Sequence, residues 1–76
     1  MLNVTLKDVM TQGYLYVEEH QSTGKALGVM RDMRISCLFV LRNNTPTGIV
    51  TERRIMSKAL SNKNIYTTPI TEVIPM

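Results

Sequence analysis

A short apolar run in the middle of the chain limits the possible folds more than any other feature of the sequence. Residues 37–41 read Cys-Leu-Phe-Val-Leu, and such a run between polar segments favours a β-strand that is covered on both faces. Residues 42–46, Arg-Asn-Asn-Thr-Pro, have the composition of a turn. Residues 47–50, Thr-Gly-Ile-Val, read as a second short strand, so the sequence predicts a β-hairpin.

The segment before the hairpin carries the signals of a short helix and a strand. Thr5 and Asp8 are spaced as a capping box, in which each side chain accepts a hydrogen bond from the backbone N–H of the other residue. We therefore expect a helix over residues 6–11, ended by Gly13. Residues 14–17, Tyr-Leu-Tyr-Val, are β-prone and predict a short strand.

A longer amphipathic helix is expected between this strand and the hairpin. Ser22 is a suitable N-cap for residues 23–34, where apolar residues recur at helical spacing: Ala26, Leu27, Met30 and Met33. Gly28 lies inside this helix, where glycine costs about 1 kcal/mol relative to alanine, and Gly24 lies one turn earlier. The two glycines either let another backbone approach closely or are simply tolerated.

A last helix is expected after the hairpin. Thr51 is a suitable cap for a helix from Glu52 to about Leu60, whose buried face would consist of Ile55, Met56 and Ala59. Its first turn also carries Arg53 and Arg54, where free N–H groups and the helix dipole already leave partial positive charge. Each exposed cation there destabilises the helix by about 0.3–1 kcal/mol. A bound phosphate would make the interaction of these cations with the helix start favourable. Alternatively, both guanidinium groups point to water or pair with a carboxylate.

The C-terminal residues repeat the pattern of the N-terminus. Residues 70–74, Ile-Thr-Glu-Val-Ile, copy residues 6–10, Leu-Lys-Asp-Val-Met, as apolar, polar, acidic, valine, apolar. Residues 68–69, Thr-Pro, would be the N-cap and first residue of a further helix. A unit that begins again near its end indicates a repeat architecture. We assign residues 1–66 to a single repeat and residues 67–76 to the start of a second repeat or to a C-terminal linker segment.

Composition narrows the class of protein. A chain of 76 residues with 43% hydrophobic residues suits one small domain with a thin core. We read no signal peptide and no membrane segment in it. The net charge of +3 is dispersed, which argues against nucleic-acid binding. The single cysteine, Cys37, is expected to be a buried, unreactive small hydrophobe in a reducing cytoplasm.

Four motifs, in order, resemble those of the CBS repeat, the cystathionine-beta-synthase-type regulatory domain. Residues 6–11 resemble its opening motif, apolar-x-Asp-Val-Met-Thr, and residues 26–30, Ala-Leu-x-x-Met, the middle of its first helix. Residues 35–40, Ile-Ser-Cys-Leu-Phe-Val, are similar to Ile-Ser-x-Leu-Pro-Val. Residues 48–55, Gly-Ile-Val-Thr-Glu-Arg-Arg-Ile, are similar to Gly-Ile-Val-Thr-Glu-Arg-Asp-Ile. The expected fold is α+β, helix–strand–helix–strand–strand–helix, with a short mixed sheet packed on two helices.

The resemblance implies a regulatory module. Repeats of this family usually occur in pairs, whose clefts often bind adenine nucleotides such as AMP or ATP and control a fused or partner domain. The alternative is a purely structural dimerisation module without a ligand. Because so short a chain buries little surface, we expect a homodimer through the helix faces. The residues expected near the contact are Ala26, Met30, Met33, Ile55, Met56 and Ala59.

Three positions depart from the family pattern. Phe39 stands at the strand proline, His20 at an acidic position, and Arg54 at the aspartate that typically accepts hydrogen bonds from a ribose diol. Arginine has donors only, so Arg54 is expected to contact phosphate instead. Tyr14 and Tyr16 either stack on a base or are core or interface aromatics. The candidate ligand-binding residues are Thr11, Tyr14, Tyr16, Ser36, Cys37, Phe39, Thr51, Arg53 and Arg54.

Catalysis is not expected. An enzyme needs converging reactive groups, whereas the one histidine and the one cysteine lie in segments with different roles. His20 reads as a solvated loop residue. The sequence has no metal-ligand spacing of Cys and His and no glycine-rich phosphate loop. We therefore predict a binding module with no catalytic residue, no metal and no cofactor beyond the nucleotide ligand.

Overall fold

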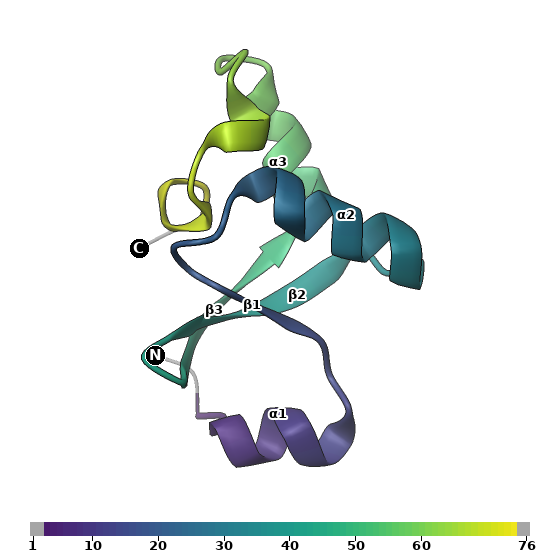
Figure 1. The fold of residues 1–76 in the computed structure, drawn as a ribbon, viewed down its shortest axis with the longest axis vertical. Helices are drawn as coiled ribbons and strands as arrows, with labels where there is room; N and C mark the ends of the chain where they lie inside the picture. Colours follow the sequence, from purple (N-terminus) through teal and green to yellow (C-terminus); the bar gives the residue numbers. More distant parts are fainter. Residues whose placement is uncertain (1–2, 75–76) are drawn as a thin grey trace.

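The computed structural model describes residues 3–74, which form three helices, a three-stranded sheet and two 3₁₀ turns (Figure 1). The helices are α1 (Leu6–Gln12), α2 (Thr23–Met33) and α3 (Glu52–Ala59). The strands are β1 (Tyr16–Glu18), β2 (Cys37–Arg42) and β3 (Thr45–Thr51), and the 3₁₀ turns are η1 (Ile65–Thr67) and η2 (Ile70–Glu72). This order confirms the expected α+β fold.

The sheet contains the predicted hairpin. Its strand order is β1-β2-β3, with β1 parallel and β3 antiparallel to β2. Asn43 and Asn44 form the turn with φ angles of 49° and 64°, which suits the two-residue turns that favour asparagine. The register shifts between Val40 and Leu41, and Thr47 of β3 is the extra residue of this β-bulge. The bulge later decides which side chains of β3 face the core.

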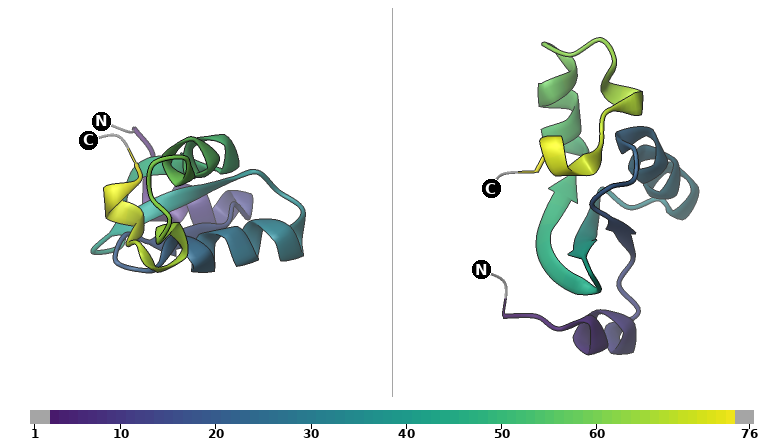
Figure 2. Two further views of the ribbon diagram at one scale, coloured as in Figure 1. Left: turned by 90° about the horizontal axis from the view of Figure 1, so that it is seen from above. Right: turned by 60° about the vertical axis from the view of Figure 1, so that its left-hand side comes forward.

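The two longer helices cover one side of the sheet, and α1 lies on the other (Figures 1 and 2). Side chains of the sheet, α2, α3 and both 3₁₀ turns form one core: Val17, Ala26, Met30, Leu38, Val40, Val50, Ile55, Ile65, Ile70, Val73 and Ile74. Val9 of α1 is buried outside this cluster. No helix within residues 3–74 is long and apolar enough to cross a membrane.

The central strand β2 is covered less completely than its apolar sequence predicts. Leu38 and Val40 are buried in the core, and Leu41 is buried beyond the bulge. Phe39 is only half-buried and Cys37 is exposed. Alternate side chains of a strand point to opposite faces, and the short α1, rather than a full helical layer, lies on the side of the second face (Figure 1). The predictions of a strand covered on both faces and of a buried Cys37 are therefore wrong.

Local capping confirms the predicted helix starts. The Thr5 hydroxyl accepts the Asp8 N–H at 3.1 Å, the Asp8 carboxylate accepts the Thr5 N–H at 3.0 Å, and Gly13 ends α1 with φ 73°. The hydrogen bonds from the Thr5 backbone and side chain lower the pKa of Asp8, because they favour its charged form. Ser22 caps α2 and Thr51 caps α3, each accepting a backbone N–H, at 3.1 Å and 3.0 Å.

Element ends differ from the predictions by one or two residues. The first helix extends to Gln12, and β1 spans residues 16–18 rather than 14–17. Tyr14 cannot join the strand because its N–H still bonds to the Val9 carbonyl at the end of α1, at 3.0 Å. The second helix stops one residue early, since Arg34 takes the left-handed conformation as its C-cap, with φ 56°.

The apolar helix faces are buried only in part. Ala26, Met30 and Ile55 belong to the core of this chain, whereas Met33 and Met56 are 55% and 57% exposed. The apolar sides of α2 and α3 pack against the sheet of the same chain. Three of the six residues expected near a homodimer contact are therefore buried within this chain, and the homodimer itself stays a prediction.

The two glycines of α2 differ in their surroundings. A Cβ added to Gly24 would lie 2.9 Å from the backbone oxygen of Tyr66 in η1. A Cβ added to Gly28 would meet nothing within 4 Å among the described residues. Close approach of another backbone therefore explains Gly24, and within this chain Gly28 is tolerated.

The C-terminal copy of the opening motif packs into the same core. Its apolar residues are all buried: Ile70, Val73 and Ile74. The expected helix start at Thr68 and Pro69 is wrong, because η2 is a single 3₁₀ turn with Pro69 as N-cap. The Thr68 hydroxyl does not cap it and donates instead to the Asn64 carbonyl, at 3.0 Å. The assignment of residues 67–76 to a second repeat or a linker stays a prediction.

Candidate ligand-binding site

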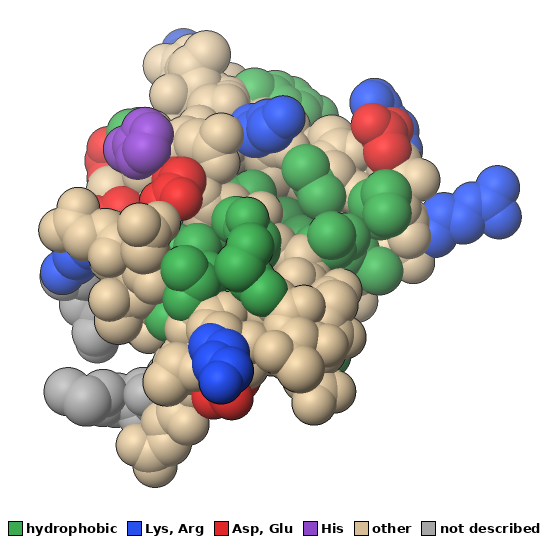
Figure 3. All heavy atoms as spheres, turned by 60° about the horizontal axis from the view of Figure 1, so that its bottom comes forward, with side chains coloured by type: hydrophobic (Ala, Val, Ile, Leu, Met, Phe, Trp, Pro, Cys, Tyr) green, Lys and Arg blue, Asp and Glu red, His purple; other side chains and the backbone are tan. Residues whose placement is uncertain are grey.

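An apolar hollow lies between the sheet and the segment that follows α1. Its volume is about 240 Å³, and it is lined by Gly13, Tyr14, Leu15, Ile35, Cys37, Leu38, Phe39 and Ile49. Figure 3 views the molecule from the side of α1 and shows apolar side chains gathered among polar ones. Ligand pockets usually measure about 300–1,000 Å³, so the hollow is better suited to be one wall of a site than a complete site.

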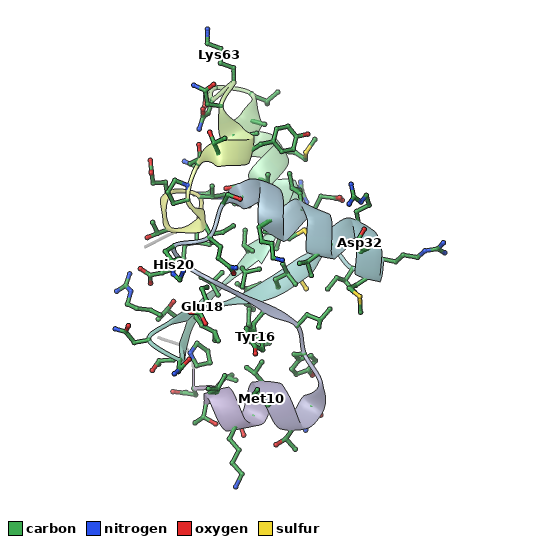
Figure 4. All side chains as sticks on the ribbon, in the orientation of Figure 1. Met10, Tyr16, Glu18, His20, Asp32 and Lys63 are labelled. Atoms are coloured by element: carbon green, nitrogen blue, oxygen red, sulfur yellow. The ribbon has the colours of Figure 1, made fainter. Side chains whose placement is uncertain are left out.

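An apolar row crosses the sheet beside this hollow. Tyr14 and Phe39 pack with ring centroids 5.6 Å apart and planes tilted by 44°, within the range of favourable aromatic pairs. Phe39 lies in register between Tyr16 of β1 and Ile49 of β3. Tyr16 and Ile49 are 38% and 44% exposed, and the Tyr16 side chain extends from β1 towards α1 (Figure 4). This surface can receive a flat apolar group.

The first turn of α3 lies at the same end of the sheet as the hollow. Cys37, which lines the hollow, pairs across the ladder with Thr51, the N-cap of α3. Arg53 is exposed and Arg54 is half-buried. Among residues 3–74 neither of these arginines forms an ion pair with a carboxylate. The Arg54 Nε donates instead to the backbone oxygen of Val73, at 3.1 Å.

The structure brings together only some of the predicted ligand residues. Three of them line the hollow: Tyr14, Cys37 and Phe39. Tyr16 lines a groove between β1 and α2, and Ser36 lines a second groove, with Cys37, between the end of α2 and the start of α3. The other four line neither the hollow nor these two grooves: Thr11, Thr51, Arg53 and Arg54.

Sequence reasoning missed several walls of the hollow, of which Ile49 is the most instructive. A regular two-residue turn at residues 43–44 would place Gly48 opposite Phe39. The bulge at Thr47 moves Ile49 into that position instead. Because a shift by one residue exchanges the two faces of a strand, Val50 points into the core. Ile49 lies on the open face, which is the face of the sheet that carries the hollow. Gly48, directly after Thr47, is the local signal that could have indicated this bulge, because a glycine inside a strand often marks one.

The described residues offer no converging reactive groups. No set of three or more His, Cys, Asp or Glu in that part of the chain could hold a metal ion. His20 is exposed, as expected of a loop residue, and it lies near an ion pair between Glu19 and Arg42 that ties the β1–α2 loop to the end of β2. This polar cluster is best explained as a structural link.

Comparison with known proteins agrees with the motif resemblance. The sequence profile of the CBS domain matches residues 6–61. The uncharacterised protein MJ1404 of Methanocaldococcus jannaschii is 34% identical over 68 residues, a match that takes in 88% of this chain and 16% of that protein. The chain therefore corresponds to a small part of this relative.

Solved structures share the fold. The CBS domain NE2398 has a TM-score of 0.72 at 24% identity, over 86% of this chain and 53% of that one. The CBS-domain protein ATU1752 from Agrobacterium tumefaciens has a TM-score of 0.75 at 17% identity, over 99% and 62%. Hypoxic Response Protein I, solved with two coordinated zinc ions, has a TM-score of 0.71 at 28% identity, over 92% and 58%.

The chain spans 53% to 62% of these solved chains. The profile match covers most of the chain, and the four motifs lie on the elements that the resemblance assigns to them. This protein belongs to the CBS-domain family.

Proposed function

We propose that the chain is a regulatory ligand-sensing module that binds an adenine nucleotide, or a related phosphorylated ligand, in a cleft completed by a second repeat. One observation carries the proposal: an apolar hollow with an aromatic pair lies at the same end of one sheet as a cationic helix start, whose arginines have no carboxylate partner among residues 3–74. A nucleotide has the matching parts, a flat base and a phosphate. CBS domains commonly serve regulatory ligand-binding roles, which agrees with this assignment.

The residues divide the recognition between them. Tyr14 and Phe39 would contact the base, since aromatic faces stack on any nucleobase. Arg53 and Arg54 would contact the phosphate through their guanidinium groups, since the backbone N–H groups of Glu52 and Arg54 are already held by the Ser36 carbonyl and the Thr51 hydroxyl. The proposal assigns no catalytic residue, so the signal is the binding of the ligand itself. We propose that the module acts in the cytoplasm on another domain of a longer protein or on a partner.

A second repeat would cover the open face of the sheet. The row formed by Tyr16, Phe39 and Ile49 leaves apolar surface exposed there, beside a hollow that needs a second wall. We propose that the second repeat is a copy of this chain, paired through this row, because the inner residues of the helix faces are already used in the core. The outer face of α3, with the exposed Met56, is the competing contact.

Two matched variants distinguish these contacts. Ile49→Lys places a charge on the open sheet face, and Met56→Lys places one on the outer face of α3. Light scattering after size exclusion, at about 100 µM, should show a dimer for the wild type and Met56→Lys and a monomer for Ile49→Lys, because 100 µM lies far above micromolar dissociation constants. A monomeric wild type would contradict pairing. A dimeric Ile49→Lys would contradict the sheet-face contact.

Calorimetry with AMP, ATP and free adenosine tests the ligand proposal. AMP should bind more tightly than adenosine, since adenosine lacks the phosphate. Loss of base stacking costs about 1–3 kcal/mol, so Tyr14→Ala should weaken AMP binding by about fivefold or more. Tyr66→Ala, which removes an exposed tyrosine of η1 outside the hollow, is the control and should bind like the wild type. Equal binding of adenosine and AMP would contradict the phosphate role.

A structural dimerisation module is the second candidate. Two observations favour it: Arg54 stands where the family carries its ribose-binding aspartate, and its Nε is already used by the Val73 carbonyl. If a dimeric sample binds none of the three ligands, this second function replaces the first.

A further inference from the structure

Arg54 connects two parts of the fold that are 19 residues apart in the sequence. Its side-chain Nε donates to the Val73 backbone oxygen at 3.1 Å, and its backbone N–H donates to the Thr51 hydroxyl at 3.0 Å. Arg54 is half-buried, and Val73 is buried in the core. The side chain thus links the capped start of α3 to residues 70–74, the C-terminal turn.

The C-terminal turn has backbone tethers at its first half. The Ile70 N–H donates to the Gln21 carbonyl at 2.9 Å, and the Thr71 N–H donates to the Glu19 carbonyl at 3.0 Å. In the second half, the N–H groups of Val73 and Ile74 both return to the Ile70 carbonyl, at 2.8 Å and 3.2 Å. Among the described residues, the hydrogen bond that reaches this second half from outside the turn comes from Arg54.

We propose that Arg54 is a latch that holds the C-terminal turn against α3 and that a phosphate bound at the first turn of α3 releases it. Bidentate binding of phosphate by the side of a guanidinium uses Nε together with one Nη. A phosphate bound in this way competes with the Val73 carbonyl for the same donor. The loosened segment is the one that repeats the opening motif, so the state of the ligand site would reach the C-terminal end of the core.

The two halves of this inference rest on different grounds. The latch rests on the contacts of Arg54 alone. The release rests on the proposed nucleotide function, because it needs a phosphate at α3. Coupling of this kind is reciprocal: a ligand that opens the latch is bound more tightly once the latch is already open.

Amide hydrogen exchange measured by NMR tests the latch with a matched pair of variants. Arg54→Met keeps most of the apolar stem and removes the donors, and Arg53→Met removes the same charge from the same helical turn without touching Val73. Exchange at the Ile74 amide should be about tenfold faster in Arg54→Met, equivalent to about 1.4 kcal/mol, and unchanged in Arg53→Met. The Leu38 and Val40 amides should keep their wild-type protection in both variants.

A rate at Ile74 within twofold of the wild type in Arg54→Met would overturn the latch. If Arg54→Met also loses protection in β2, the wild type decides the question by itself. The Arg54 Nε proton should then exchange at least tenfold more slowly than that of the exposed Arg53. Equal exchange at the two Nε protons would overturn the latch without any substitution.

Addition of AMP to the wild type tests the release, with adenosine as the control that lacks phosphate. AMP should speed exchange at Ile74, and adenosine should leave it unchanged. An unchanged or slower rate with AMP overturns the release. Calorimetry on the same samples separates the two failures: bound AMP without faster exchange refutes the release alone, whereas AMP that does not bind refutes the proposed function as well.

Discussion

Replacing each glycine of α2 by alanine should change stability in opposite directions. Alanine is favoured over glycine inside a helix by about 1 kcal/mol. At Gly28 the new Cβ meets nothing within 4 Å among the described residues, so Gly28→Ala should raise the free energy of unfolding by about 0.4–1 kcal/mol. At Gly24 the new Cβ would lie 2.9 Å from the Tyr66 carbonyl oxygen. That oxygen belongs to the backbone, so η1 itself has to move.

The cost at Gly24 follows from what holds η1 in place. The Thr68 carbonyl, directly after η1, accepts the Thr23 N–H at 2.8 Å and the Thr23 hydroxyl at 2.7 Å. Thr23 is fully buried, so water cannot replace these bonds when η1 shifts. Overpacking costs about 1–3 kcal/mol, which exceeds the gain in helix propensity. Gly24→Ala should therefore lower the free energy of unfolding by about 1 kcal/mol.

Thermal and urea unfolding followed by circular dichroism would measure the difference. A change of about 1 kcal/mol shifts Tm by 4–8 °C in a domain of this size, so the two variants should differ by roughly 6–16 °C. Each should be measured at several protein concentrations, because dimerisation makes stability depend on concentration. If Gly24→Ala proves as stable as Gly28→Ala, the close approach of η1 is not the reason for Gly24.

Three further predictions follow from burial and capping. Ile55→Ala should cost about 2–5 kcal/mol in urea unfolding, since Ile55 is fully buried, whereas Met56→Ala should stay within about 0.5 kcal/mol; equal effects would contradict the assigned helix face. Cys37 is exposed, so a thiol reagent should label the native protein without denaturant, and labelling only after unfolding would contradict its position. The pKa of Asp8 lies below its ordinary value of 3.8. The stability that Asp8 contributes is therefore present above that value and is lost as the pH falls through the folded pKa. The stability difference between the wild type and Asp8→Asn should disappear in acid, and a difference that persists there would refute the role of the carboxylate.

The aromatic pair of the candidate site was partly predictable. Phe39 was named from a family motif and Tyr14 from its aromatic character, and the structure brings their rings together in the hollow. The partner of Arg54 was not predictable, because Val73 lies 19 residues further along and only the packing of the C-terminal turn brings its carbonyl to the guanidinium. Cys37 was misread because an apolar run shows that a strand is buried without showing whether both faces are.

The sequence by itself determined the features that depend on neighbours three or four residues away. The capping box of Thr5 and Asp8, the caps at Ser22 and Thr51, and the asparagine turn of the hairpin all form from local hydrogen bonds and local φ preferences, which the residue types set directly. These signals were enough to order the helices and strands along the chain.

The tertiary structure decided which surface each element meets. The bulge at Thr47 exchanges the faces of β3, so that Val50 rather than Ile49 enters the core. Residues 70–74 form a turn rather than a separate helix, and their apolar side chains join the core cluster of the sheet, α2 and α3. Both outcomes depend on contacts between segments far apart in the chain, and burial is a property of those contacts rather than of the residues that make them.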